Sequence, residues 1–155
     1  MTTVLTYGTF DLFHIGHVRL LSRLATLGDR LIVGVSTDEF NAGKGKHAFI
    51  PYEHRAEIVA SMRSVDQVIP ENNWAQKRAD IITYGVDIFA IGSDWQGKFD
   101  DLKDLCEVRY LERTDGISST ELKAQLAAPE PQEIERLGHA LDILQQVVDN
   151  YRGLP

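Results

Sequence analysis

Near its N-terminus the chain reads Val-Leu-Thr-Tyr-Gly-Thr-Phe-Asp-Leu-Phe-His-Ile-Gly-His over residues 4–17. Residues 4–7 form a short run of β-prone side chains that ends at Gly8, and residues 15–27 carry apolar side chains at helical spacing. Residues 31–35 then form a continuous apolar run, which is typical of a strand covered on both faces of a parallel sheet. The pattern predicts a strand, a loop, a helix and a second strand.

The same alternation continues along the chain. Pro51 can begin a helix, whose buried side would carry Tyr52, Ile58, Val59 and Met62. The later elements are expected to be strands at 65–69, 87–91 and 108–111 and helices at 74–84 and 102–106. Five strands with intervening helices indicate an α/β fold, a Rossmann-like doubly wound sheet of about five parallel strands with helices on both faces.

Length and composition favour one compact domain with a short appendage. The chain has 155 residues, of which 43% are hydrophobic and 25% charged, as in ordinary globular proteins. Its apolar runs are much shorter than the roughly 18 residues of a membrane span, so no membrane insertion is expected. Residues 1–17 lack the pattern of a secretory signal, which predicts a cytoplasmic protein. The single cysteine, Cys106, cannot form an intramolecular disulfide and is expected in the core.

The net charge of −7 argues against a broad cationic surface for nucleic acid or anionic lipid. A small anionic substrate still fits where basic residues gather, because a local field can override the global sign. The basic residues near expected loops or helix starts are Lys44, Lys46, Arg55, Arg63, Lys77, Arg78 and Arg113.

The loop after the first strand is the first place to expect a ligand, because open α/β sheets bind ligands outside the carboxyl ends of their strands. His14 and His17 are three residues apart at the expected helix start, so both imidazoles can face the same way. Gly16 leaves no side chain between them that would block a phosphate lying against the backbone. Each histidine alone would be an ordinary, partly buried side chain; together with the helix-start N–H groups they indicate a phosphate site.

Several competing motifs are missing. Residues 43–45 do not belong to a G-x-x-x-x-G-K-[ST] loop, Gly8 does not begin a dinucleotide-binding glycine pattern, and no G-x-S-x-G elbow occurs. P-loop kinases, dehydrogenases and hydrolases of that type are therefore disfavoured. Zinc is also the weaker interpretation of His14 and His17, because no third ligand stands at motif spacing.

Two segments resemble a known family. Residues 14–17, His-Ile-Gly-His, look like the first signature of the HxGH nucleotidyltransferase superfamily, and residues 113–120, Arg-Thr-Asp-Gly-Ile-Ser-Ser-Thr, look like its second signature in cytidylyltransferases. The segments at 36–40, 52–55, 68–71 and 94–100 are similar to the glycerol-3-phosphate cytidylyltransferase family. The resemblance spans residues 1–126 and departs from the family modestly at Asp115 and Ser119, where glutamate and threonine are usual.

The resemblance implies transfer of CMP from CTP to glycerol 3-phosphate, giving CDP-glycerol and pyrophosphate for cell-surface polymer biosynthesis. An acceptor phosphate already carries negative oxygens, so positioning and charge stabilisation would dominate catalysis. The residues that the resemblance assigns to catalysis are His14, His17 and Arg113, and those it assigns to the acceptor are Lys44 and Lys77. The residues implied to bind the nucleotide are Thr9, Phe10, His14, Ile15, Gly16, His17, Lys46, Arg113, Thr114, Asp115, Gly116, Ile117, Ser118, Ser119 and Thr120.

Five further residues are expected to support the site. Asp11 is either a cap of the coming helix or an active-site residue. Arg55 and Arg63 either bind anions or brace the site through a carboxylate such as Asp66, and Asp94 would orient substrate or assist a metal ion.

A divalent cation, Mg²⁺, is the expected cofactor, held mainly by the nucleotide and water because no carboxylate cage is evident and no protein ligand can be assigned. Trp74 and Trp95 are either packing residues or walls of the site. Two other functions stay open: a related nucleotidyltransferase acting on another polyol or sugar phosphate, and a nucleotide-binding module without catalysis.

Residues 129–131, Pro-Glu-Pro, interrupt the chain after the helix expected to end near Leu126. Residues 1–128 are therefore expected to form the catalytic domain, and residues 129–155 a linker and an appended C-terminal amphipathic helix. The heptad-like apolar seam of this helix consists of Ile134, Leu137, Leu141, Leu144, Val148 and Tyr151, widened by Ala140, Ile143 and Val147. The helix either packs on its own domain or on a partner, and we expect a homodimer to which it contributes.

Overall fold

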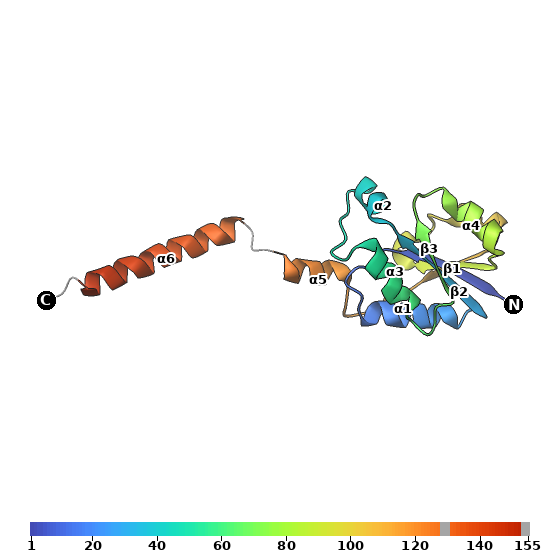
Figure 1. Cartoon of the computed structure of the whole chain (residues 1–155), viewed down its shortest axis with the longest axis horizontal. Coiled ribbons are helices and arrows are strands. Elements are labelled where there is room, and N and C mark those ends of the chain that lie inside the picture. Colours follow the sequence, from blue (N-terminus) through green and yellow to red (C-terminus); the bar gives the residue numbers. More distant parts are fainter. Residues whose placement is uncertain (128–130, 153–155) are drawn as a thin grey trace. The chain divides into compact units, whose positions relative to one another are not determined.

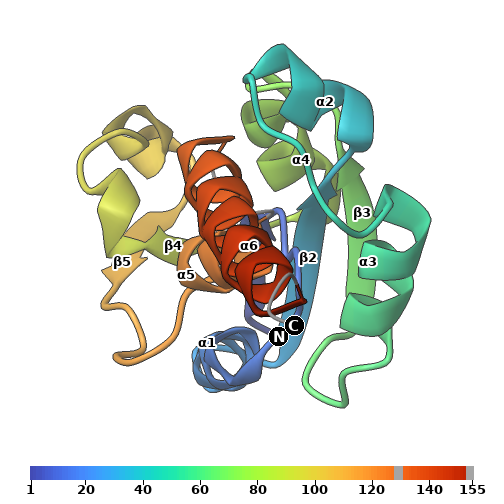
Figure 2. The same cartoon turned by 90° about the vertical axis from the view of Figure 1, so that its left-hand side faces the viewer.

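The computed structural model describes residues 1–127 and 131–152. Within this part of the chain, five parallel strands form one sheet in the order β3-β2-β1-β4-β5. The strands are β1 (Thr3–Gly8), β2 (Arg30–Ser36), β3 (Gln67–Glu71), β4 (Ile88–Gly92) and β5 (Glu107–Leu111). Figure 2 shows β3 and β5 at the two edges of the sheet. The predicted doubly wound parallel sheet is confirmed.

Helices follow most of the strands. They are α1 (Ile15–Ala25), α2 (Asp38–Gly43), α3 (Tyr52–Ala60), α4 (Gln76–Tyr84) and α5 (Ser119–Leu126), with the 3₁₀ helices η1 (Ser93–Trp95) and η2 (Asp100–Asp104). Local sequence sets several ends: Pro51 stands at the N-cap of α3, and Gly85 ends α4 in the left-handed conformation with φ of 59°.

Each face of the sheet carries its own apolar core. On one face, Leu21 and Leu24 of α1 and Val59 of α3 pack against the strands. On the other face, Ile81 of α4 and Leu102 of η2 belong to the second core. Figure 1 shows α1 and α4 on opposite sides of the strands. Helices therefore cover both faces, as predicted.

Two predicted elements differ in position or type. β3 begins at Gln67, later than the predicted 65–69, because the N–H of Val65 closes a turn on the carbonyl of Met62 before the strand starts. The helix predicted at 102–106 is instead the short 3₁₀ helix η2, which ends at Asp104 before β5. Both differences lie at connections, where apolar periodicity carries little information.

Helix α2 was not predicted; its N-cap Thr37 accepts the N–H of Phe40. Two predictions of burial were wrong or incomplete. Ile58 is 39% exposed, because the inward stripe of α3 is occupied by Arg55 and Val59. Cys106, expected in the core, is only half-buried at its margin.

The strand order reverses between β1 and β4, since β2 and β3 follow on one side of β1 while β4 and β5 lie on the other. Loops leaving the carboxyl ends of these two strands diverge at this point and open a crevice, which is where doubly wound sheets bind ligands. The loop between β1 and α1, residues 9–14, lies at this point of the fold.

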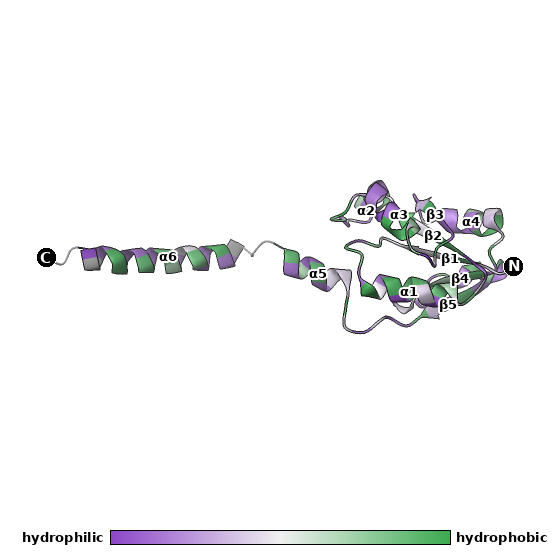
Figure 3. Ribbon diagram, turned by 60° about the horizontal axis from the view of Figure 1, so that its bottom comes forward, coloured by the Kyte–Doolittle hydropathy of each residue, from purple (hydrophilic) through white to green (hydrophobic). Residues whose placement is uncertain are grey.

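The chain divides into two compact units, Met1–Leu122 and Lys123–Pro155. The second contains α6 (Pro131–Arg152), along which hydrophobic residues recur (Figure 3). Seam residues Ile134, Leu137, Leu141, Leu144 and Val148 are between 43% and 66% exposed. The predicted domain boundary and the Pro129–Glu130 part of the linker lie outside the described residues, as does the side chain of Tyr151. No helix in the described ranges is both long and apolar enough to cross a membrane.

Candidate active site

The loop between β1 and α1 has an unusual backbone. Phe10 and Leu12 have φ angles of 53° and 49°, in the left-handed region that non-glycine residues rarely adopt. Between them, the Asp11 carboxylate accepts the backbone N–H groups of Phe49 and Ile50 at 2.8 and 3.0 Å. This tether from the chain after α2 holds the strained loop in place.

Asp11 therefore does not cap α1, which was one of its two predicted roles. The N-cap position is occupied by His14, whose ring nitrogen Nδ1 accepts the N–H of Gly16 at 3.0 Å. The ring of His17 reaches back in the same way, with Nδ1 accepting the N–H of His14 at 3.2 Å. The two histidines thus form a reciprocal capping box at the start of α1.

This capping fixes the tautomers of both rings. A neutral imidazole has one N–H, and because Nδ1 of His14 and of His17 accepts a hydrogen bond, the proton of each ring lies on Nε2. Burial lowers the pKa of His14, and burial followed by the nearby His14 ring lowers the pKa of His17 to about 4. Near neutral pH the pair therefore offers two uncharged N–H donors.

Aromatic contacts explain why His17 stays neutral. Its ring stacks on that of His14 with centroids 3.9 Å apart and on that of Phe13 at 5.2 Å, and it meets Phe10 edge-on at 5.4 Å. Rings on three sides exclude the water that would stabilise an imidazolium ion.

Gly16 is required by the His14 ring. A Cβ at this position would lie 2.7 Å from Cε1 of His14 and 3.2 Å from a methyl carbon of Ile117. The sequence suggested that Gly16 leaves room for a phosphate against the backbone. In the structure, the His14 ring and the Ile117 side chain of the second signature already occupy the space beside Gly16. Any side chain here would displace a predicted phosphate ligand.

The two signatures meet across one cavity of about 250 Å³. The predicted site residues that line it are His14, Gly16, His17, Asp94, Arg113, Thr114, Ile117, Ser118, Ser119 and Thr120. The loop after β1 thus faces the segment after β5, as expected at the switch point of the strand order.

Hydrogen bonds join the two signatures directly. Ser119 Oγ donates to the carbonyl of Asp11 at 2.8 Å and lies 3.3 Å from Nε2 of His14. Because the hydroxyl proton is used on Asp11, the oxygen can accept from the His14 Nε2–H. Ser118 caps α5 by accepting the N–H of Glu121 at 3.1 Å.

Arg113 and Asp94 face each other at the mouth of this cavity. Nη1 of Arg113 lies 3.4 Å from the Asp94 carboxylate, and both side chains are more than half exposed. Exposed ion pairs of this kind contribute little to stability, so the guanidinium is available to an incoming phosphate.

A second cavity, of about 190 Å³, is lined by three lysines, and we call it the lysine cavity. Lys44, Lys46 and Lys77 line it together with Glu71. Burial lowers the pKa of Lys44, whose Nζ lies 4.0 Å from the centroid of the Phe40 ring. Lys46, which the family resemblance assigns to the nucleotide, lines this cavity beside Lys44 and Lys77.

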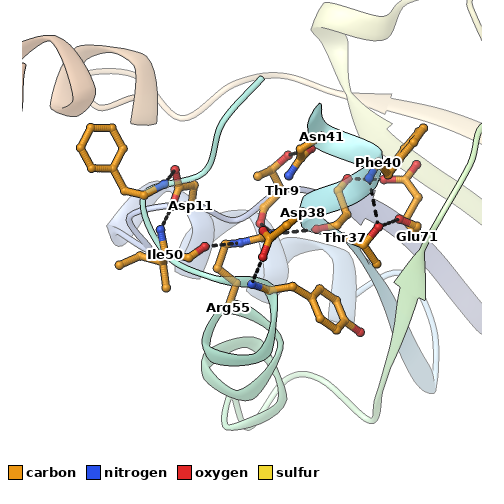
Figure 4. Close-up of polar contacts among 12 residues, drawn as sticks. Thr9, Asp11, Thr37, Asp38, Phe40, Asn41, Ile50, Arg55 and Glu71 are labelled. Atoms are coloured by element: carbon orange, nitrogen blue, oxygen red, sulfur yellow. Dashed lines mark hydrogen bonds and ion pairs between the residues drawn. The ribbon is translucent and has the colours of Figure 1, made fainter. Parts of the chain in front are cut away.

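Arg55 braces the site and does not bind an anion. The side chain is buried, and its guanidinium donates to the carbonyls of Thr9, Ser36 and Ile50 and to the Asp38 carboxylate at distances of 2.7 to 2.8 Å (Figure 4). These bonds join the ends of β1 and β2 to the start of α3. Bracing was one of its two predicted roles, but the predicted carboxylate partner, Asp66, was wrong.

Arg63 and Asp66 were predicted to support the site, but the fold places both near the amino ends of the strands, whereas the site lies at the carboxyl ends. They lie in the connection that leads from α3 into the amino end of β3. Asp66 accepts the N–H of Leu31 near the amino end of β2, at 2.7 Å. Ligands of such sheets bind at the carboxyl ends, so neither residue lies in this site.

Other predicted nucleotide residues have different surroundings. Thr9 lines the lysine cavity, Phe10 is buried in the core, and Ile15 is 48% exposed on α1. Asp115 is exposed, and Gly116 has a φ of 83°, which suits the turn of the second signature.

Ser36 and Glu71 were not predicted as site residues although they end β2 and β3. Glu71 is 3% exposed, accepts the ammonium group of Lys77 at 2.5 Å, and also accepts the hydroxyl of Ser36. Both residues are the last of their strands, so the rule that ligands bind at carboxyl ends would have found them. Trp74 and Trp95, left open before, line the same cavity.

Within residues 1–127 and 131–152, no group of three acidic, histidine or cysteine side chains could hold a metal ion. The carboxylate residues that line the first cavity are Asp94 and Glu112.

Comparison with known proteins identifies the family of the chain. Residues 5–125 match the family described as "Cytidylyltransferase-like". Over 127 residues the chain is 58% identical to "Glycerol-3-phosphate cytidylyltransferase" of Bacillus subtilis (strain 168), covering 82% of this chain and 98% of that one. It is 53% identical to the protein of that name from Staphylococcus aureus (strain NCTC 8325 / PS 47), covering 81% and 96%. The chain belongs to the glycerol-3-phosphate cytidylyltransferase family.

The fold also matches a solved structure, the "lipopolysaccharide core biosynthesis protein from Thermoplasma volcanium GSS1". The TM-score is 0.64, with 24% sequence identity, over 74% of this chain and 99% of that one. At this identity the match supports the fold alone. The cytidylyltransferase-like family match ends at residue 125. Helix α6, which begins at Pro131, lies beyond it.

Proposed function

We propose that this protein transfers a cytidylyl group from CTP to glycerol 3-phosphate, giving CDP-glycerol and pyrophosphate. The observation that carries the proposal is the pairing of two cavities along the loop after β1. One presents the neutral Nε2–H groups of His14 and His17 opposite Arg113, and the other presents three lysines. The first suits a triphosphate and the second a small phosphorylated acceptor.

The reaction needs no nucleophile from the protein. A phosphate oxygen of glycerol 3-phosphate attacks the α-phosphorus of CTP, the bond from this phosphorus to the bridging oxygen breaks, and pyrophosphate leaves with the bonding electrons. His14 and His17 would donate hydrogen bonds to the α-phosphoryl oxygens as negative charge builds there. Arg113 and the hydroxyl of Ser118 would hold the leaving phosphates, and Ser119, whose proton is used on Asp11, would position the His14 ring. Catalysis then rests on positioning and charge stabilisation.

Mg²⁺ belongs to this proposal as a cation held mainly by the nucleotide, where it would neutralise part of the triphosphate charge. Asp94 and Glu112, which line the first cavity, suit contact with such a cation through water.

A homodimer, a cytoplasmic location and a role in supplying a cell-surface polymer are further parts of the proposal. Support for self-association comes from α6, where Leu137, Leu141 and Leu144 are 60%, 66% and 61% exposed. Apolar side chains repeated at this spacing on one helix suit a second apolar helix.

A pyrophosphate-release screen tests the proposed reaction. The four nucleoside triphosphates are each combined with glycerol 3-phosphate and with a panel of polyol and sugar phosphates, in the presence of Mg²⁺. We expect CTP with glycerol 3-phosphate to give the highest kcat/KM. An equal or higher value for ATP with a sugar phosphate would overturn the substrate assignment, and absence of pyrophosphate release from every pair would overturn catalysis.

A further inference from the structure

In the lysine cavity, the ammonium group of Lys77 lies among three aromatic rings and one carboxylate. Nζ of Lys77 lies 4.5 Å from the ring centroid of Tyr7, 4.9 Å from that of Trp74 and 5.5 Å from that of Phe99. All three distances are within the roughly 6 Å at which a cation is attracted to an aromatic face. The fourth neighbour is the carboxylate of Glu71, at 2.5 Å. We call these four side chains the ammonium cage.

Three of the four cage residues are buried: Tyr7, Phe99 and Glu71 are 6%, 8% and 3% exposed, whereas Trp74, at 46%, forms the side that opens to solvent. The side chains of Lys77 and Glu71 are 3% and 4% exposed. The second carboxylate oxygen of Glu71 accepts the hydroxyl of Ser36, so the carboxylate is held from both sides. A buried ammonium group is tolerated only where such partners replace its water.

The Tyr7 ring is fixed just as firmly. Its hydroxyl donates to Asp80 at 2.5 Å, and its ring lies across Gly34 of β2, where a Cβ would approach Cδ1 of Tyr7 to 2.1 Å. Asp80 also accepts from the side-chain amide of Gln76, and both belong to α4, the helix that carries Lys77. Helix α4 therefore both carries Lys77 and, through Asp80, fixes the Tyr7 ring.

We propose that Lys77 is a specificity-determining residue: its ammonium group occupies the cage that would otherwise accept the positive tail of an amino-alcohol phosphate, and so restricts the acceptor to phosphates with an uncharged tail. This proposal rests on the proposed function. The Lys77 side chain would thus determine which small alcohol phosphates the enzyme accepts.

Charge balance supports this assignment. Three lysines and one glutamate line the cavity, which leaves two net positive charges to meet a phosphate monoester with two negative charges. A phosphate that carried its own ammonium would place a second cation beside Lys77, where the rings and Glu71 are already engaged. Its positive tail would lose its water without gaining a partner.

The size of the cavity points the same way. At about 190 Å³ it is smaller than the roughly 300–1,000 Å³ of pockets for drug-sized ligands, so a small acceptor fills it. A small acceptor cannot keep an ammonium group far from Lys77. Removal of the Lys77 side chain would leave the cage of Tyr7, Glu71, Trp74 and Phe99 open to an ammonium group from outside.

The test compares two acceptors, glycerol 3-phosphate and ethanolamine phosphate, with CTP. In the wild-type enzyme we expect kcat/KM for ethanolamine phosphate to be lower by at least roughly 30-fold, the factor expected for one desolvated cation–aromatic site. In Lys77→Ala the ratio of the two values should shift toward ethanolamine phosphate by a similar factor. Lys77→Met fills the cage with an uncharged side chain. This variant should therefore lose activity with glycerol 3-phosphate and should not gain activity with ethanolamine phosphate.

Glu71→Gln added to Lys77→Ala should remove the gain, because the cage then lacks its carboxylate. Circular dichroism checks the fold of each variant, and Lys77→Ser replaces Lys77→Ala if the latter does not fold. Equal use of both acceptors by the wild-type enzyme, or an unchanged ratio in Lys77→Ala, would overturn the proposal. So would an equal gain in Lys77→Met.

A binding measurement separates this proposal from the proposed function. The two tryptophans of the chain, Trp74 and Trp95, both line the cavity, so their fluorescence reports on its occupancy. Ethylammonium chloride should change the emission of Lys77→Ala in a saturable manner and leave the wild type and Lys77→Met unchanged, with sodium chloride as the salt control. If the wild type cannot use glycerol 3-phosphate, the proposed function fails; a saturable change confined to Lys77→Ala would still support the cage, and no change would overturn it.

Discussion

The imidazole rings of His14 and His17 stack with their centroids 3.9 Å apart, and Nδ1 of each ring accepts a backbone N–H at the start of α1. This arrangement fixes the orientation of each ring and disfavours a positive charge on either. The two Nε2–H groups are therefore donors placed before any substrate arrives. Donors fixed in advance stabilise a developing charge without the cost of reorganising at the moment of reaction.

The first prediction concerns the chemical step. His17→Ala should lower the single-turnover rate of CMP transfer by roughly 10²- to 10³-fold, because one donor to the α-phosphoryl oxygens is lost. The affinity for CTP should change much less. The matched control is His54→Ala on the exposed surface of α3, which should keep the wild-type rate. Near-normal chemistry in His17→Ala would remove this ring from its proposed role.

The second prediction concerns acid stability. The pKa of His17 is lowered to about 4 in the fold, against 6.5 in its absence, so between these values the unfolded chain binds a proton that the folded protein does not. The stabilisation from a neutral His17 is present above pH 6.5 and is lost as pH falls toward 4. The full effect is roughly 3 kcal/mol.

Urea unfolding from pH 7 to pH 4 measures this effect. His17→Asn should show a weaker fall of the unfolding free energy with pH than the wild type, whereas His54→Asn should match the wild type. Identical pH profiles for the wild type and His17→Asn would show that the ring is protonated equally in both states.

The third prediction concerns Gly16. Gly16→Ala places a methyl group 2.7 Å from the His14 ring and 3.2 Å from Ile117, so it should move the ring away from the position in which we propose that it binds phosphate. We expect kcat to fall by at least about 10-fold, since misplacing a catalytic group by about 1 Å can cost 100-fold. Gly43→Ala is the control, because no atom lies within 4 Å of an added Cβ there. Equal kcat values in the two variants would contradict the crowding argument.

The fourth prediction concerns the bracing guanidinium of Arg55. Arg55→Lys keeps the charge but cannot donate to the carbonyls of Thr9, Ser36 and Ile50 and also to Asp38. The free energy of unfolding should fall by about 3 kcal/mol, because backbone carbonyls of three segments lose a charged donor that the shorter ammonium group cannot replace at all of them. The control is Arg78→Lys, an exposed partner of Asp104, where little change is expected. A fully stable Arg55→Lys would show that these bonds are dispensable.

The fifth prediction concerns α6. Truncation after Ala128 should weaken self-association in sedimentation experiments and leave activity per folded site largely unchanged. In the full chain, Leu141→Glu on the apolar seam should weaken association, whereas Gln146→Glu on the polar side should not. An equally tight dimer after truncation would exclude the assembly role, and loss of activity in folded protein would show that the helix supports the active site.

Local chemistry was enough to predict the alternation of strands and helices and the loop that carries the two histidines. Residues 31–35 are apolar without interruption because both faces of the sheet are covered, and Gly85 and Pro51 mark helix ends by their backbone preferences. The histidines of the first signature were predictable for the same reason, since three residues of helix bring their rings together. Such patterns depend on neighbours in the sequence.

Contacts between distant segments could not be predicted in this way. Arg63 and Asp66 looked like site residues, yet the connection that carries them enters β3 at its amino end, away from the site. The partners of Arg55 and the pairing of Lys77 with Glu71 depend on the strand order β3-β2-β1-β4-β5, which brings the carboxyl ends of β1, β2 and β3 together. Local periodicity carries no record of which strands become neighbours. Burial then decides which polar groups must pair, and only the folded chain shows their partners.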